Sequence, residues 1–103
     1  MIKFIKTFTR PNANVEFFNA KTFMDQPSKI HMKTTYMDTG KMIPAEQQLS
    51  TDGLSLTTVV MFDTEQSLNE FKADSIIQAS LLEARSLYNQ ANSITETTTV
   101  ETV

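Results

Sequence analysis

The 103-residue sequence has no cysteine and no tryptophan, and it contains only two glycines and one histidine. The lack of cysteine excludes a disulfide scaffold, a thiol nucleophile and any thiolate metal site. Gly40 and Gly53 are too far apart to form a glycine-rich phosphate-binding loop. A single histidine also leaves no pair of imidazoles at helical spacing for a metal. We therefore expect neither a metal nor another cofactor.

Long apolar runs are also missing. The longest, residues 59–62, is far too short to cross a membrane. Lysines interrupt the apolar residues at positions 1–6, so no signal peptide is predicted. The composition, 40% hydrophobic and 20% charged, is typical of one globular domain spanning residues 1–103. We expect a soluble, cytoplasmic protein that makes no membrane contact.

Charge is unevenly distributed along the chain. Residues 1–41 carry seven of the nine basic residues, whereas residues 42–103 carry nine of the twelve acidic ones. Because the net charge is −3, this distribution favours ion pairing between the two halves over a nucleic-acid surface.

Four segments have strand character. Residues 2–9 alternate apolar and polar, and residues 54–62 end in the continuous apolar run that is typical of a central strand. Pro44 confines the weaker strand at 42–51 to a sheet edge, and Asp52-Gly53 predicts a two-residue type I′ hairpin turn. The Thr-rich segment 94–103 is a weak edge strand or a frayed tail.

The segments between these strands carry apolar residues at helical spacing. Residues 14–39 read as one broken helix or two short ones, with Asn12 or Asn14 as a cap, an interruption at Pro27 and a new cap at Ser28. A second helical region follows residue 63, capped by Asp63 or Thr64. A kink or second cap at residues 74–75 then precedes the most regular helix, 75–92.

This order predicts an α+β domain of ferredoxin-like β-α-β-β-α-β type. Its four-stranded antiparallel sheet would have the first and third strands in the centre and helices on one face. The residues expected to face the helices are Phe4, Phe8, Leu54, Leu56, Val60 and Phe62. The opposite face would carry Ile5, Thr7, Thr57, Val59 and Met61. That face is apolar enough to predict a homodimer through sheet packing, with a solvated monomer as the alternative.

Three stretches, IKFIKTF, LSLTTVVMFDTEQSLNEF and LYNQANSIT, resemble the dimeric α+β barrel superfamily in the layout of antibiotic-biosynthesis-type monooxygenases. The chain is also similar to small uncharacterised proteins of marine environmental sequence sets. The resemblance covers nearly the whole chain, but it is one of layout without a specific motif. It implies a ferredoxin-like fold and a dimer, and it carries no activity across. Members of the superfamily bind small aromatic or polyketide-like substrates between the helices and the sheet.

Few residues qualify as site candidates. His31 is a weak catalytic candidate without a partner in sequence, and a lone histidine on an amphipathic segment is more often a half-exposed helix residue. In the resembled superfamily, haem-degrading members use a histidine in an aromatic-rich pocket, and the lack of tryptophan here argues against that role. The weak ligand-binding candidates for the helix–sheet cleft are Tyr36, Arg85 and Tyr88, although Tyr88 also fits core packing.

Two further groups have alternative readings. Lys29, Lys33 and Lys41 would bind an anion or form a solvated basic face. The methionines would line the base of an adaptable pocket or fill irregular core space. They are Met24, Met32, Met37, Met42 and Met61. The strand at 54–62 lacks the basic-glycine-aromatic pattern of RNA-binding sheets.

Three functions stay open. The leading hypothesis is a dimeric protein, without established catalysis, that binds a small apolar ligand between helices and sheet. The second is a cofactor-free, monooxygenase-like enzyme in which His31, Tyr36 or Tyr88 contributes. The third is a protein-interaction module that offers residues 94–103 as an added strand.

Overall fold

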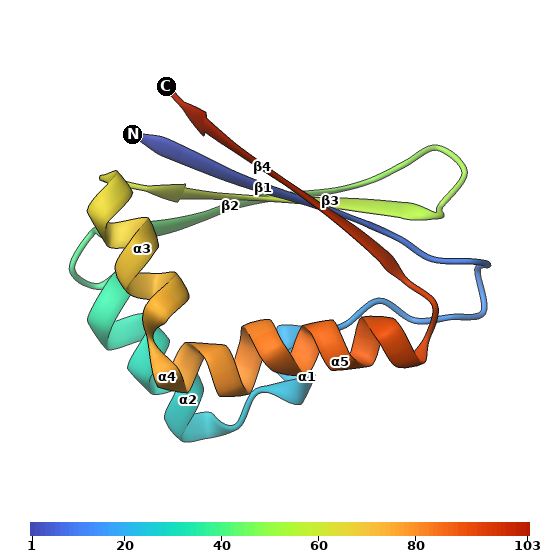
Figure 1. The fold of residues 1–103 in the computed structure, drawn as a ribbon, viewed down its shortest axis with the longest axis horizontal. Helices are drawn as coiled ribbons and strands as arrows, with labels where there is room; N and C mark the ends of the chain where they lie inside the picture. Colours follow the sequence, from blue (N-terminus) through green and yellow to red (C-terminus); the bar gives the residue numbers. More distant parts are fainter.

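The computed structural model describes residues 1–103, apart from the side chain of Ala45. Four strands form one antiparallel sheet in the order β2-β3-β1-β4 (Figure 1). The central strands are β1 (Ile2–Thr9) and β3 (Ser55–Phe62), and the edge strands are β2 (Met42–Leu49) and β4 (Thr95–Thr102). The predicted strand order is therefore confirmed, including the place of Pro44 on an edge.

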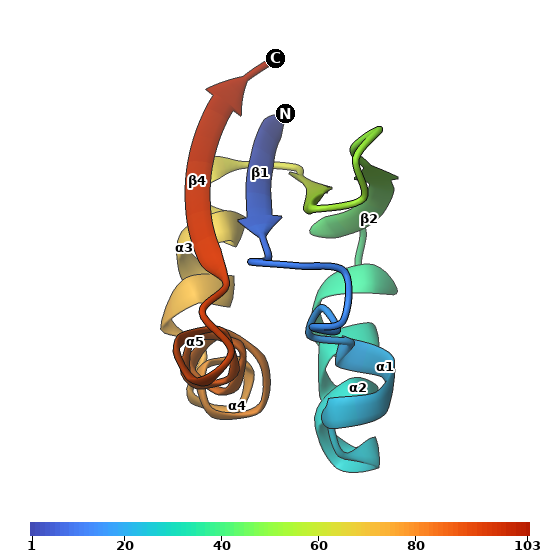
Figure 2. The same cartoon turned by 90° about the vertical axis from the view of Figure 1, so that its right-hand side faces the viewer.

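Helices cover one face of this sheet in two columns. The first column follows β1 and comprises α1 (Ala20–Phe23), α2 (Gln26–Met32) and the π-helical turn η1 (Lys33–Met37). The second follows β3 and comprises α3 (Glu65–Ala73), α4 (Ser75–Ile77), the π-helical turn η2 (Gln78–Leu82) and α5 (Glu83–Ala91). Figure 2 shows α1 and α2 on the β2 side of the sheet and α5 on the β4 side. This is the predicted ferredoxin-like fold.

The sheet presents one covered and one uncovered face, as its pleat requires. In the β1–β3 register, Phe4 lies opposite Val60 and Phe8 opposite Leu56, and both phenylalanines are buried toward the helices. Phe62, also on this side, is fully buried together with Ile77 of α4. The predicted division between the two faces holds for the residues within the strands.

On the uncovered face, Ile5 lies opposite Val59, Thr7 opposite Thr57, and Lys3 opposite Met61. Leu54, expected to face the helices from the third strand, precedes β3 and belongs to the connecting loop.

The first helical region starts later than predicted. Helix α1 begins at Ala20 because the Asn19 side chain accepts a hydrogen bond from the Lys21 amide at 3.0 Å. Asn12 instead accepts from the amide of Asn14 at 2.9 Å, a local turn that competes with helix formation. The prediction that Asn12 or Asn14 caps a helix was therefore wrong.

The predicted interruption of the first helical region occurs at Met24 and Asp25, and Pro27 follows it inside α2, which begins at Gln26. Pro27 stands in the first turn of α2, where the missing amide proton costs no hydrogen bond. The N-cap is Asp25, whose carboxylate accepts from the Ser28 amide at 2.8 Å. Ser28 is thus a buried helix residue, and its predicted capping role was wrong.

The hairpin occurs where predicted, but its turn differs. Residues 50–54 connect β2 to β3, and the Gly53 amide donates to the Ser50 carbonyl at 2.9 Å. Gly53 has φ of 75°, whereas Asp52 keeps a negative φ, so the type I′ prediction was wrong. The Asp52 carboxylate instead accepts from the Leu54 amide at 3.0 Å and stabilises a longer loop.

The second helical region has the predicted caps, but the predicted regular helix 75–92 contains the π-helical turn η2 between α4 and α5. Thr64 caps α3 by accepting from the Ser67 amide at 3.1 Å, and Asp74 caps α4 as a second start. The segment 94–103, left open between strand and tail, forms the edge strand β4 and pairs with β1 along its whole length. None of the helices in the described part of the chain could span a lipid bilayer.

Two ion pairs link the basic first part of the chain to the acidic second part. Lys6 of β1 pairs with Glu96 of β4, and Lys41 pairs with Glu70 of α3 at 3.0 Å. These contacts follow the charge distribution along the sequence.

Candidate functional site

A cavity of about 620 Å³ lies between the helices and the covered face of the sheet. Its wall is built by β1, β2, β3, α1, α2, η1, α5 and the segment before α1. The apolar lining residues are Phe8, Phe17, Phe18, Ala20, Met24, Met32, Met37 and Leu56. The polar and charged ones are Asn19, Lys21, Lys29, Lys33, Gln47, Thr58, Arg85 and Asn89. The cavity thus combines an aromatic and methionine wall with a few polar groups.

Arg10 holds the segment that precedes α1. Its Nε and Nη2 donate to the Gly53 carbonyl at 2.9 and 2.6 Å, and its Nη1 donates to the Val15 carbonyl at 3.0 Å. The guanidinium also lies 4.6 Å from the ring centre of Phe17. Through these contacts Arg10 joins the β2–β3 loop to residues 15–17 and fixes Phe17 at the cavity wall.

An aromatic cluster of Phe18, Phe23 and Tyr88 joins α1 to α5. Phe18 stacks on Phe23 at 4.9 Å between ring centres and meets Tyr88 edge-on at 5.7 Å. The Tyr88 hydroxyl donates to the Glu16 carbonyl at 2.6 Å. The cluster thus links the two helical columns through Phe18, which itself lines the cavity.

Arg85 projects from α5 beneath the central strands. Its guanidinium lies 4.9 Å from the ring centre of Phe8, and its Nε is buried with no hydrogen-bond partner among the described residues. Burial lowers the pKa of Arg85, and the nearby carboxylate of Glu96 only partly offsets this. Arg85 lines both the large cavity and a smaller one of about 50 Å³.

The carboxylate of Glu96 on β4 interacts with Lys6 and Asn89 and not directly with Arg85. Lys6 pairs with its carboxylate, and the buried Asn89 donates to its second oxygen at 3.4 Å. Burial tends to raise the pKa of Glu96, but Lys6 and Arg85 outweigh that effect and lower it. At neutral pH Glu96 is therefore an ionised carboxylate.

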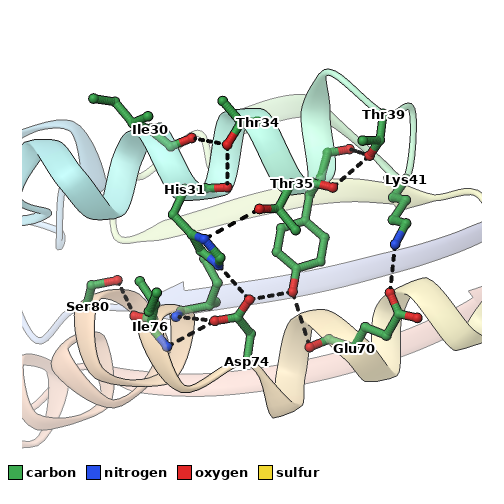
Figure 3. Close-up of polar contacts among 12 residues, drawn as sticks. Ile30, His31, Thr34, Thr35, Thr39, Lys41, Glu70, Asp74, Ile76 and Ser80 are labelled. Carbon is green, nitrogen blue, oxygen red and sulfur yellow. Dashed lines mark hydrogen bonds and ion pairs between the residues drawn. The ribbon is translucent and has the colours of Figure 1, made fainter.

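His31 and Tyr36 meet at Asp74, outside the cavity lining. His31 Nε2 lies 2.7 Å from the Asp74 carboxylate, and the Tyr36 hydroxyl donates to the same oxygen at 2.7 Å. Figure 3 shows His31 reaching from its helix toward Asp74, while Lys41 reaches Glu70 beside it. The Asp74 oxygen that is left accepts from the amides of Ile76 and Ile77.

This network shifts the pKa values of Asp74 and Tyr36 in opposite directions. Burial alone would raise the pKa of Asp74, but hydrogen bonds from Tyr36 and His31 outweigh it and lower the pKa to about 2. Burial raises the pKa of Tyr36, and the adjacent Asp74 charge raises it further. Asp74 is thus a carboxylate and Tyr36 a neutral phenol, an arrangement that braces η1 against the α3–α4 junction.

The structure separates the candidates that the sequence suggested. Arg85, Lys29 and Lys33 line the cavity, and so do Met24, Met32 and Met37. Tyr88 stands in the aromatic cluster behind the wall, and His31 and Tyr36 stand in the Asp74 network. Lys41 pairs with Glu70, Met42 belongs to the core, and Met61 lies on the uncovered sheet face.

Sequence reasoning did not single out several wall residues. Phe17, Asn19 and Lys21 fall in the part of the chain that the sequence assigned to a helix, whereas the structure places Phe17 and Asn19 in the irregular segment before α1. Asn89 could have been predicted to line the same cleft as Arg85, because it follows Arg85 by four residues and lies on the same side of the helix. No three potential metal-ligating side chains cluster together in the part of the chain that the structure describes.

The fold is similar to that of a Deinococcus radiodurans protein named as a candidate antibiotic biosynthesis monooxygenase, whose crystal structure was solved at 1.40 Å resolution. The superposition has a TM-score of 0.61 and 10% sequence identity, and it covers 100% of this chain and 92% of that chain. No protein-family model and no curated protein matches the sequence. At this identity the likeness concerns the fold alone. The chain has the ferredoxin-like α+β fold of that monooxygenase-type protein.

Proposed function

We propose that this protein binds a small, largely apolar organic molecule in the cavity between its helices and its sheet. The observation that carries the proposal is the cavity itself, whose 620 Å³ lies within the range of small-molecule sites. Half of its sixteen lining residues are apolar, and three of these are methionines. Methionine side chains adapt to irregular ligands, so the site suits an organic guest better than water alone.

The neutral fluorescent probe N-phenyl-1-naphthylamine tests this proposal. We expect its emission to rise and shift to shorter wavelength on binding, with micromolar affinity. Thr58→Trp, which adds bulk from a central strand into the cavity, should weaken probe binding at least about fivefold. Leu87→Trp adds the same ring on the exposed side of α5 and should leave binding unchanged. Equal binding by both variants would place the probe elsewhere and contradict the proposal.

We also propose a homodimer formed through the uncovered sheet face. This face carries Ile5, Val59 and Met61 on the central strands and Ile43 on β2, which is 48% exposed. Covering a few hundred Å² of such surface contributes several kcal/mol at about 25 cal/mol per Å². Packing the same face of two copies together is the simplest symmetric cover.

A cofactor-free monooxygenase is the alternative function, favoured by the name of the structurally similar Deinococcus radiodurans protein. Catalysis would need a proton acceptor near the bound molecule, yet His31, Tyr36 and Tyr88 are not among the described lining residues. Binding without turnover is therefore the better-supported function. Oxygen uptake by the protein with a bound phenolic ligand, above the rate of the ligand alone, would favour the enzyme instead.

A further inference from the structure

The charges around the cavity have one sign. Four of its sixteen described lining residues are cationic, and none is acidic. The cations are Lys21, Lys29, Lys33 and Arg85. The chain as a whole holds twelve acids and has a net charge of −3, so this wall is opposite in sign to the rest of the protein. A cavity with cationic walls of low dielectric attracts and holds anions.

Arg85 is the cation that lies deepest. It extends beneath Phe8 at the junction of the two cavities, and its buried Nε–H has no partner among the described residues. A buried donor without an acceptor is rare in native structures and calls for an explanation. The phenylalanine ring offers only a cation–π contact, which does not satisfy the hydrogen-bonding capacity of the guanidinium.

The neighbouring carboxylate does not neutralise this charge. Glu96 forms its ion pair with Lys6, and no described carboxylate lies within ion-pair distance of Arg85. Lys6 and Arg85 are thus two cations near a single carboxylate, that of Glu96. One positive charge between α5 and the sheet is left without a partner. Arg85 as a whole is half-buried, with its Nε enclosed. A charge held this far from water is normally paired, which makes the unpaired guanidinium the contact point for an external ligand.

The lysines add charge nearer the solvent. Lys29 donates to the main-chain carbonyl of Lys21, and Lys33 pairs with Asp38 at 2.9 Å on an exposed surface. An exposed pair of this kind binds weakly and leaves the lysine available. The lysines therefore add positive charge at the solvent side of the cavity, whereas Arg85 lies against the central strands.

We propose that the ligand of this cavity is an amphipathic organic anion, whose carboxylate or similar acidic group binds the Arg85 guanidinium while its apolar body packs against Phe8 and the methionines. This inference rests on the proposed function, because it specifies the ligand class of the same site. Arginine suits the role since its planar fork matches a carboxylate with two parallel hydrogen bonds. The apolar wall supplies affinity, and the cation selects among apolar molecules of similar shape.

Two probes that differ by one charged group test the selection. N-phenyl-1-naphthylamine is neutral, and 8-anilino-1-naphthalenesulfonate has the same aromatic amine with a sulfonate added. We expect the wild-type protein to bind the sulfonate about tenfold or more tightly than the neutral probe. If neither probe binds, the proposed function fails. If both bind equally, the cavity binds small molecules and only the inference about the anion is overturned.

Arg85→Met removes the charge and keeps an apolar stem. It should weaken sulfonate binding about 10- to 100-fold, the range of a charged hydrogen bond, and change the affinity for the neutral probe far less than that. Lys72→Met on the exposed surface of α3 makes the same change in net charge, so it measures any general attraction of the anion. Equal weakening by both variants would mean that net charge, and not Arg85, selects the probe.

The Nε–H resonance of Arg85 gives a second readout that does not depend on a variant. The chain has only two arginines, Arg10 and Arg85, so a ¹⁵N spectrum contains two such signals. Saturating sulfonate should shift the Arg85 signal and leave that of Arg10, which donates to Gly53, in place. An unmoved Arg85 signal with the probe bound would overturn the inference, even if Arg85→Met failed to fold.

Discussion

The hydroxyl of Tyr36 donates to the carboxylate of Asp74 across 2.7 Å, and this contact joins η1 to the junction between α3 and α4. Both residues are remote in sequence, and the same carboxylate also meets His31 and caps α4. One carboxylate therefore holds together the first and second helical columns. The stability of this junction depends on Asp74 being ionised.

Asp74 should make the stability of the fold depend on pH in the acidic range. Its pKa falls from 3.8 to about 2 on folding, so its contribution is complete above about pH 4 and is lost as pH falls toward 2. We expect Asp74→Asn to lower the free energy of unfolding by about 1–2 kcal/mol at pH 6, with little difference from the wild type near pH 2. Urea unfolding between pH 2 and 7 measures this. A difference that stays constant over that range would contradict the assignment.

Removing the Tyr36 hydroxyl should affect stability without affecting the cavity. Tyr36→Phe keeps the buried ring but leaves the Asp74 carboxylate with one donor fewer, so we expect a loss of about 1 kcal/mol. Binding of N-phenyl-1-naphthylamine should not change, because Tyr36 is not among the described lining residues. A marked loss of probe affinity with intact folding would instead place the Tyr36 hydroxyl in the binding site.

The strands were predictable because their signals are local. Alternation at residues 2–9, the apolar end of β3 and the restriction that Pro44 imposes on its neighbours each follow from a few adjacent residues. The position of β4 was harder, because its eight residues are exposed and it is held by backbone pairing with β1. Such a strand has no hydrophobic pattern to read.

The cavity depends on contacts between distant parts of the chain. Arg10 reaches the carbonyl of Gly53 across the β2–β3 loop, and Tyr88 reaches that of Glu16, so the segment before α1 is shaped from outside. The spacing of residues 14–19 predicted a helix, whereas these contacts hold the segment in an irregular conformation. Arg85 was foreseeable as a charged residue four positions after the buried Leu81, but its unpartnered state follows only from the packing of α5 on Phe8.

Arg10 should control the cavity wall from a distance. Arg10→Met removes its hydrogen bonds to the Gly53 and Val15 carbonyls and its contact with Phe17, so we expect about 2 kcal/mol of destabilisation. Amide hydrogen exchange in residues 11–19 should accelerate, and the affinity for N-phenyl-1-naphthylamine should fall severalfold. Lys72→Met serves as the control, since it removes a cation that has no part in this segment. Unchanged exchange in residues 11–19 would contradict the role of Arg10.

The proposed dimer should depend on the uncovered face of β3. We expect light scattering at micromolar concentration to give about 23.2 kDa, twice the chain mass of 11.6 kDa. Val59→Lys places a charge at the centre of this face, opposite Ile5, and should reduce the mass to that of one chain. Leu87→Lys adds the same charge on the exposed side of α5 and should leave the dimer intact. A wild-type mass near 11.6 kDa would refute the dimer.

Deleting residues 94–103 should unfold the domain. The deletion removes Ile94 from the core and the whole of β4, which leaves the hydrogen-bonding edge of the central strand β1 exposed. We expect loss of the cooperative thermal transition and of probe binding. A control that replaces Thr97 and Thr99 by alanine retains the backbone ladder and should still fold, because both side chains are exposed. If the shortened chain keeps its transition, β4 is dispensable for folding, and its role as a strand offered to a partner becomes the better explanation.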